Sequence, residues 1–219
     1  MDNFDFKDSN IGAGARLSLE FYLRPDVVQV ARDLLGKVLV THFDGQLTAG
    51  VITETEAYRA PDDRACHAFG NRRTARTEVM FQEGGRAYIY LCYGIHHLFN
   101  VVTGPAEMAH AVLIRGVEPL EGLETMQMRR KMNNTGKPRP VTALTTGPGA
   151  LSQALGLTTE WTGQRFFTPG TPVWIEDRGL QNDETEIAAG KRIGVDYAGA
   201  CAEWPWRFWL KNSRFVKKV

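Results

Sequence analysis

The alternation of apolar and polar residues predicts a chain made mainly of short strands. Residues 38–43 are expected to form one strand and residues 46–56 its return strand. Asp44-Gly45 between them is a strong signal for a two-residue hairpin turn. Residues 17–22 fit a short strand or a turn. Further strands are expected at 86–92, 99–102, 111–115, 173–176, 194–195 and 208–210.

Helices are predicted where apolar residues recur at helical spacing. Pro25 opens the first, because a proline at the first helical position loses no hydrogen bond, and Gly36 ends it. A short helix after Pro61-Asp62-Asp63 would carry His67 back over the end of the preceding strand. The remaining helices are expected to open at Pro119, reaching about residue 130, and at Gly147-Pro148, reaching residue 155.

These elements predict an α+β fold in which helices surround an antiparallel or mixed sheet. The chain has no internal repeat, low-complexity block or clear linker. We therefore expect a single compact domain over residues 17–219. Residues 1–16 mix polar residues and glycine with scattered apolar ones and read as an N-terminal tail.

Composition and charge narrow the class of protein. The chain is 43% hydrophobic with a formal net charge of +1, so any affinity for nucleic acid must come from a local patch. Three cysteines, an odd number, favour reduced thiols over a disulfide framework. No secretory signal or apolar run of about 20 residues is present. We expect a protein of the cytosol that is neither secreted nor bound to a membrane.

Candidate chemistry gathers between residues 53 and 100. Glu54, Glu56 and Tyr58 share one face of the return strand if it stays regular. Arginines and further tyrosines follow them. A carboxylate in a partly apolar pocket can act as a general base on water, whereas the alternative for either glutamate is a surface position or a structural ion pair. The combination suits a planar, polar ligand that carries phosphate.

Several other chemistries find little support. No glycine-rich phosphate loop is present. The sets Cys92, His96, His97 and Cys66-His67 match no standard zinc spacing, so we expect no metal. No lysine occurs from residue 38 to residue 130, so this span offers no side-chain amine for Schiff-base catalysis. The basic run over residues 129–140 is either a solvated loop or a phosphate contact.

A series of short motifs resembles the alkyladenine (3-methyladenine) DNA glycosylase family over residues 17–211. The order and spacing of the motifs both agree with that family, as does the end of the match at 192–195 and 207–209. The motifs are Thr55-Glu56-Ala57-Tyr58, Pro61-Asp62-Asp63, Ala65, His67, Met80-Phe81, Gly85, Tyr88-Ile89-Tyr90, Tyr93-Gly94, Asn100, Leu113, Arg115, Glu118-Pro119 and Gly147-Pro148 with Leu151.

The resemblance implies the family's fold, with a curved sheet, and a monofunctional base-excision repair enzyme without cofactor or metal. Such an enzyme flips an alkylated or deaminated purine out of damaged duplex DNA and hydrolyses its N-glycosidic bond. It would act as a monomer in the bacterial cytoplasm and nucleoid, or in the nucleus of a eukaryote.

The resemblance also assigns roles to individual residues. Glu56 matches the acid that activates water, and Arg115 matches a residue beside that water and a DNA phosphate. Tyr93 would enter the minor groove and fill the gap left by the flipped nucleotide. The pocket residues are Tyr58, His67, Tyr90, Asn100 and Leu113, and the further DNA contacts are Met80, Arg72, Thr74 and Arg76.

Some assignments have structural alternatives. Asn100 could be a satisfied buried amide, and Tyr88 is expected to pack in the core. In the family the loop after the arginines commonly reads Thr-Pro-Arg-Asn. Here the loop reads Thr74-Ala75-Arg76-Thr77 and is followed by Glu78, whose charge would weaken binding to a phosphate.

Two other classes of protein compete with the glycosylase. A non-catalytic nucleic-acid-binding module would use Glu56 only structurally. A metal-dependent hydrolase would use the cysteine and histidine cluster. Release of free base from alkylated duplex separates the enzyme from the binding module, and activity that survives chelation excludes the metal enzyme.

Overall fold

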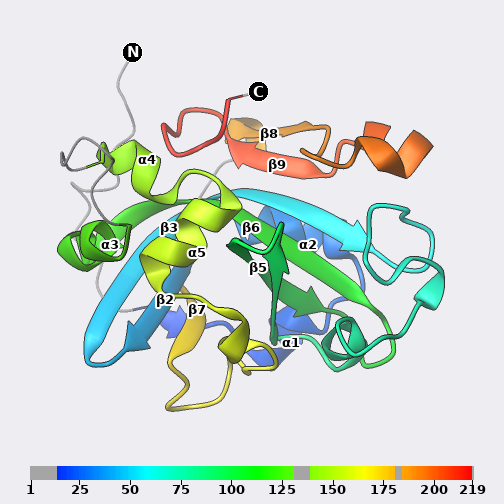
Figure 1. The fold of residues 1–219 in the computed structure, drawn as a ribbon, viewed down its shortest axis with the longest axis horizontal. Coiled ribbons are helices and arrows are strands. Elements are labelled where there is room, and N and C mark those ends of the chain that lie inside the picture. Colours follow the sequence, from blue (N-terminus) through cyan, green and yellow to red (C-terminus); the bar gives the residue numbers. More distant parts are fainter. Residues whose placement is uncertain (1–13, 131–138, 181–183, 219) are drawn as a thin grey trace.

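A computed structural model describes residues 14–130, 139–180 and 184–218, and its strands form one antiparallel sheet. The hydrogen-bonded order is β1-β7-β2-β3-β6-β5-β4, and β9 joins β3 to β8 (Figure 1). The strands are β1 Ala15–Arg16, β2 Val38–Phe43, β3 Gln46–Arg59, β4 Ala87–Cys92, β5 His96–Thr103, β6 His110–Glu121, β7 Val173–Asp177, β8 Ile187–Gly190 and β9 Arg207–Leu210.

Strand β3 is the axis of the sheet because three other strands pair with it. Its first half pairs with β2 through the Asp44-Gly45 turn, and most of its length pairs with β6. On the side opposite β6, β2 gives way to β9, which pairs with residues 54–56. The sheet therefore divides at the centre of β3, and the β8–β9 pair leaves the plane there, as Figure 1 shows.

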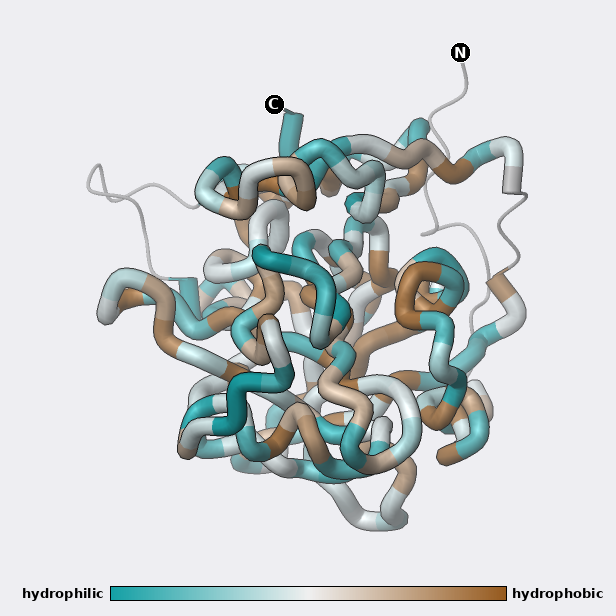
Figure 2. Tube along the Cα trace, turned by 90° about the vertical axis from the view of Figure 1, so that its right-hand side faces the viewer, coloured by the Kyte–Doolittle hydropathy of each residue, from teal (hydrophilic) through white to brown (hydrophobic). Residues whose placement is uncertain are grey.

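Helices cover the sheet from both sides (Figure 1). The α2 helix packs against β3 and β6 on one side, and α5 packs against β5 and β6 on the other, together with α3 and α4. Seen from the side that carries residues 59–86, the foremost loops are largely hydrophilic (Figure 2). The α-helices are α1 Leu19–Tyr22, α2 Val27–Asp33, α3 Leu123–Arg130, α4 Val141–Thr145 and α5 Pro148–Leu155.

Short 3-10 helices complete the described elements. They are η2 Phe69–Asn71, η3 Glu78–Phe81, η4 Thr159–Trp161, η5 Glu184–Glu186 and η6 Asp196–Glu203.

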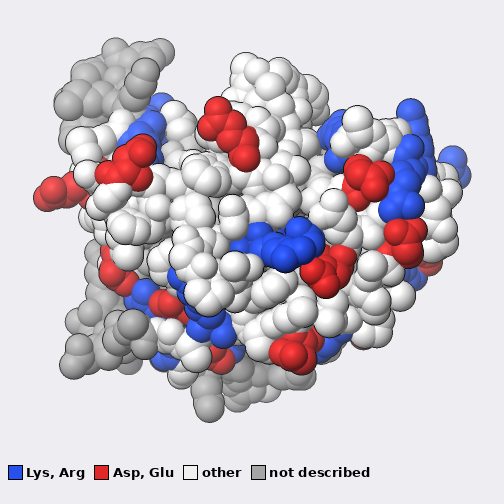
Figure 3. Space-filling model, turned by 90° about the horizontal axis from the view of Figure 1, so that it is seen from below, with Lys and Arg blue, Asp and Glu red and all other residues white. Residues whose placement is uncertain are grey.

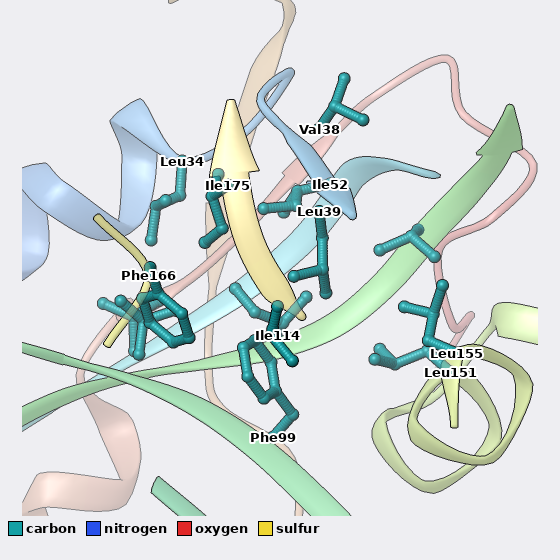
Figure 4. Close-up of a cluster of buried hydrophobic side chains, with 14 of the residues drawn as sticks. Leu34, Val38, Leu39, Ile52, Phe99, Ile114, Leu151, Leu155, Phe166 and Ile175 are labelled. Atoms are coloured by element: carbon teal, nitrogen blue, oxygen red, sulfur yellow. The ribbon is translucent and has the colours of Figure 1, made fainter. Parts of the chain in front are cut away.

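One large hydrophobic cluster joins the helices to the sheet. Phe99 and Phe166 are fully buried, with their ring centroids 5.8 Å apart. Leu151 and Leu155 of α5 point into this cluster from one side and Leu34 from the other (Figure 4). Since burial of a large apolar side chain contributes about 1.5–3 kcal/mol, this cluster fixes β3, β5 and β6 relative to one another.

The structure confirms the α+β class, the single compact domain and most elements placed by pattern. The Asp44-Gly45 turn has positive φ at both residues, 51° and 73°, as a tight hairpin turn requires. The α5 helix begins at Pro148 and ends before Gly156. The first long helix begins at Val27 rather than at Pro25, because the Asp26 carboxylate caps it by accepting from Val28 N and Gln29 N, both at 3.1 Å.

Four local predictions were wrong. Residues 19–22 form a helix, and residues 194–195 form no strand. Pro119 lies within β6, at a register shift opposite Gly50, and α3 begins only after Gly122, whose φ of 74° separates strand from helix. After Pro61 the chain forms turns rather than a helix, because the Asp63 carboxylate accepts from the backbone N–H of Ala65 instead of capping a helix.

Parts of the sequence analysis fall outside the described residues. Most of the expected tail lies there, although Ala15 and Arg16 pair with β7 as β1. The basic run is described only at its two ends, residues 129–130 and 139–140. Among the described residues, no helix is both long enough and apolar enough to cross a lipid bilayer.

Candidate active site

Two carboxylates are buried at the point where the sheet divides. Glu54 and Glu56 have no exposed surface, and the register between β3 and β6 shifts on both sides of Glu54. These bulges re-aim the side chains of β3. As a result both carboxylates reach Arg115 of β6, Glu54 at 2.9 Å and Glu56 at 3.3 Å.

Glu54 is held by structural partners. Its Oε1 also accepts from Arg207 Nε of β9 at 2.6 Å, and its Oε2 accepts from the backbone N–H of Lys217 at 3.0 Å. One carboxylate thus joins β3, β6, β9 and the C-terminal segment. This matches the structural ion pair that the sequence left open for a glutamate here.

Glu56 has fewer charged neighbours than Glu54, and its other contacts are with uncharged donors. Its Oε2 accepts from the Tyr58 hydroxyl at 2.6 Å, and its Oε1 accepts from the backbone N–H of Ile193 at 2.7 Å. Burial raises the pKa of the Glu56 carboxyl, while Arg115, Tyr58 and Ile193 oppose that rise. A carboxylate with a raised pKa is a stronger base than a solvated one.

A cavity of about 430 Å³ opens beside these groups. Three of the groups that contact Glu56 also line it, namely Tyr58, Arg115 and Ile193. Most of its wall is aromatic or apolar. The other lining residues expected from the sequence are His67, Met80, Tyr90, Tyr93, Asn100 and Leu113.

His67 is held in one orientation within this wall. Its ring meets Tyr90 edge-on, with centroids 4.6 Å apart, and its Nδ1 lies 2.7 Å from the Tyr88 hydroxyl. Burial, together with the charge of Arg76, lowers the pKa of His67 to about 4, so the ring is neutral at physiological pH. The Arg76 guanidinium, which can only donate, lies 3.1 Å from Nε2 and 3.4 Å from Nδ1 of this ring.

Tyr58 rests on a buried ion pair. The Arg192 guanidinium lies 4.8 Å from the centre of the Tyr58 ring and binds Asp63 through two contacts, 2.5 and 2.8 Å. Neither charged side chain of the pair has exposed surface. The same guanidinium donates to the carbonyls of Ala57 and Cys201, so it ties the turn after β3 to η6.

Asn100 and Met80 are both buried in the pocket wall. The Asn100 amide donates to the carbonyls of Tyr88 and Leu98, at 3.0 and 3.2 Å, so it is a satisfied amide that also lines the cavity. Met80 is only 1% exposed, and its side chain forms part of the wall rather than of the outer surface.

The turn between β4 and β5 projects an apolar tip. Tyr93 is 92% exposed and has a positive φ of 51°, a conformation that bulky residues rarely adopt. Leu91 and Ile95 beside it are also exposed. Tyr93 lines the cavity as well, so the tip stands at its rim.

The loop that departs from the family pattern is held by ion pairs. Arg73 binds Glu107 through two contacts, 2.9 and 3.0 Å, and Glu78 at 3.0 Å. The charge of Glu78 is therefore paired, which reduces the repulsion expected toward a phosphate. Thr74 forms a turn with Thr77, and Arg72 is exposed. Arg76 lies 4.8 Å from the centre of the Tyr90 ring, so the structure places it against the pocket wall.

Sequence reasoning missed three contributors to the site. Tyr88 is buried as expected, but its hydroxyl orients His67. Ile193 supplies a backbone N–H, which no sequence pattern identifies. Lys217, which lies outside the lysine-free span, also lines the cavity. The only feature of the sequence that could have pointed to Lys217 is the basic composition of the C-terminal segment.

The described residues contain no group of three metal-ligating side chains. All three cysteines are free thiols, and burial raises the pKa of Cys66 to about 12, which makes it unreactive.

Comparison with known proteins identifies the family. A family model described as methylpurine-DNA glycosylase (MPG) matches residues 20–214. Relatives from Chlamydia abortus, Bacillus licheniformis and Bacillus cereus strain G9842 carry the name 3-methyladenine DNA glycosylase as a provisional assignment. They are 47%, 45% and 42% identical to this chain, and the matches cover 87%, 92% and 88% of it and 95%, 96% and 95% of the relatives.

A buried carboxylate beside an aromatic cavity is a site suited to hydrolysis at a planar base. The chain belongs to the methylpurine-DNA glycosylase family, which confirms the resemblance drawn from its motifs. It is thus a DNA-repair enzyme that hydrolyses N-glycosyl bonds.

The Asp63–Arg192 pair provides a test of how the site is supported. Asp63→Ala should lower the free energy of unfolding by about 3–5 kcal/mol, because it leaves a buried guanidinium without its partner. Asp62→Ala is the matched control, since the Asp62–Arg59 pair is exposed and worth about 0–1 kcal/mol. Urea unfolding at neutral pH measures both, and equal effects would show that the buried pair does not support the site.

Proposed function

We propose that this enzyme binds an alkylated or deaminated purine, flipped out of duplex DNA, in the aromatic cavity and hydrolyses its N-glycosidic bond with a water that Glu56 deprotonates. The substrates are of the 3-methyladenine, ethenoadenine and hypoxanthine class. The position of Glu56 carries the proposal, because this carboxylate is fully buried and contacts three groups of the cavity wall.

The cavity supports recognition of a damaged base by its faces. Tyr58 and Tyr90 both line it, and a base stacked on an aromatic ring gains about 1–3 kcal/mol. Alkylation places positive charge on a purine, which strengthens its attraction to aromatic faces and improves it as a leaving group. The fixed Asn100 amide, which already donates to two carbonyls, would crowd the exocyclic amino group of a normal guanine.

The hydrolytic step follows from the same geometry. An oxygen of water forms a bond to C1′ of the sugar while the C1′–N bond breaks and the base leaves with its electron pair. The Glu56 carboxylate accepts the proton of the water and stabilises the positive charge that develops on the sugar. Arg115 holds Glu56 in place and, at the cavity wall, lies close to the nucleotide that enters.

The apolar hairpin tip supports action on duplex DNA. An exposed aromatic side chain can enter the minor groove and replace the stacking of an extruded base. Tyr93 has this exposure and stands at the cavity rim. The exposed Arg72 and the neighbouring Thr74 would contact the DNA backbone, and we expect the enzyme to act as a monomer in the bacterial cytoplasm and nucleoid.

Glu56→Gln tests the base directly. This variant should still bind a duplex that carries a damaged purine but release no base, since an amide cannot accept the proton. Glu124→Gln is the control, because Glu124 is an exposed carboxylate of α3 that does not line the cavity, and it should retain base release. Release by Glu56→Gln at the wild-type rate would exclude Glu56 as the base.

Tyr58→Phe tests how the carboxylate is tuned. The Tyr58 hydroxyl stabilises ionised Glu56 and thereby lowers its pKa, so its removal should raise that pKa further. Because Glu56 must be ionised to act, the acidic limb of kcat/KM against pH should move to higher pH. The substrate should be a methylated purine with a permanent positive charge. Its base does not need to be protonated before it leaves, so protonation of the leaving group does not affect the pH profile. An acidic limb at the wild-type pH would contradict this role.

Tyr93→Ala tests the wedge. Binding to a lesion-bearing duplex should weaken by about 5- to 150-fold, corresponding to loss of about 1–3 kcal/mol of stacking, while binding to the same lesion in a single strand should change little. Leu47→Ala provides the control, because Leu47 is an exposed apolar residue at the opposite hairpin. Equal losses on duplex and single strand would rule out a wedge role.

We further propose that the enzyme leaves an intact abasic site, without a lyase step. Lys217 is the amine to test, since it lines the cavity. Borohydride added during the reaction should trap no covalent protein–DNA complex, because hydrolysis by water forms no imine. A trapped complex that disappears in Lys217→Gln would show that the enzyme also uses imine chemistry.

A further inference from the structure

A second cavity of about 370 Å³ adjoins the base cavity on the side of α4 and the C-terminal segment. We call it the basic cleft. Thr146, Ala150 and Lys217 line both cavities and form the border between them. The residues that line the basic cleft are Arg130, Thr142, Ala143, Thr146, Ala150, Arg214 and Lys217, three of which are cations and none of which is acidic.

Two of the cations of the cleft are available to an anionic ligand. Within the described part of the chain, neither Arg130 nor Lys217 forms an ion pair with Asp or Glu. Arg139 adds a further charge next to Arg130, whose pKa is lowered by burial and then by Arg139. On the underside of the molecule, by contrast, cations and carboxylates lie side by side (Figure 3). Like charges held together in a cleft favour an anionic ligand.

Hydrogen-bond donors in the cleft point to the same ligand. The Thr146 hydroxyl is buried and has no hydrogen-bond partner among the described residues. The α5 helix begins beside it, and Gly147 at its N-cap offers no side chain to satisfy the first N–H groups. Phosphate oxygens accept from such N–H groups and from hydroxyls, and the helix dipole adds to the attraction.

Lys217 is placed in the cleft by its backbone. Its N–H donates to Glu54 Oε2 at 3.0 Å, and its carbonyl accepts from Arg207 Nη2 at 2.7 Å. The buried charge cluster therefore fixes the chain at Lys217, while Lys217 is itself exposed and lines both cavities. Such an arrangement positions a cation next to the nucleotide that enters the base cavity.

We propose that the basic cleft binds a backbone phosphate of the DNA strand that carries the flipped nucleotide, next to that nucleotide. This inference rests on the proposed function. The cleft lies at the α4 end of the molecule, and the loop with Arg72 and Thr74 lies at the other end (Figure 1). The strand is then held on both sides of the base cavity, and the extruded nucleotide enters between two anchors.

The first test measures salt dependence with Lys217→Gln and Arg214→Gln, whose side chains are both exposed. Fluorescence anisotropy gives the affinity for a lesion-free duplex over a series of KCl concentrations. Each variant should make the slope of log K against log [KCl] less negative by about one, as loss of one phosphate contact predicts. Lys211→Gln removes the same charge from an exposed residue outside both cavities and should keep the wild-type slope.

The second test locates the phosphate. Single neutral methylphosphonates are placed at successive positions around an ethenoadenine in the lesion strand. One of them should weaken wild-type binding and have no further effect on Lys217→Gln, because the contact is already lost. Wild-type slopes in both variants, or equal methylphosphonate effects in wild type and Lys217→Gln, would overturn the proposal. Release of free base by the wild-type enzyme is assayed separately, so failure of the proposed function is distinguished from failure of the phosphate site.

Discussion

The structure depends on a set of charges buried where its sheet divides. Glu54 and Glu56 of β3 share Arg115, and Glu54 also binds Arg207. Buried ions are costly to remove from water, and the cluster is tolerable only because each charge meets an opposite charge or a hydrogen-bond donor. The bulges of β3, the pairing of β9 with β3 and the seating of Lys217 all serve these contacts.

Glu54 and Glu56 differ in character because their neighbouring groups differ. Glu54 is neutralised by two arginines, whereas Glu56 has one guanidinium contact, at 3.3 Å, and two donors from the cavity side. The first carboxylate holds strands together, and the second retains basicity next to the cavity. A second buried pair, Asp63–Arg192, supports Tyr58 in the same way, so the walls of the cavity are built on charges rather than on apolar packing alone.

Sequence patterns were most reliable where neighbouring residues decide the structure. Asp44-Gly45 encodes its own turn because both residues tolerate positive φ, and the Gly147-Pro148 helix start is equally local. Sequence patterns failed where contacts with residues far away in the chain override the local preference. Pro119 reads as a helix start, yet pairing of β6 with β3 keeps it in a strand. The turn after Pro61 reads as a helix, yet Asp63 is used to cap a turn and to bind Arg192, 129 residues away.

The sequence by itself determined the family and the α+β class, and it singled out Tyr58, His67, Tyr90 and Asn100, which line the cavity, because short motifs and local periodicity carry that information. Only the tertiary structure decided that Glu54 is structural, that Tyr88 orients His67, that Ile193 donates to Glu56 and that Lys217 reaches the cavity. These are contacts between groups far apart in the chain, and one is made by a backbone N–H. Their geometry depends on bulges and on burial of charge, which a linear pattern does not contain.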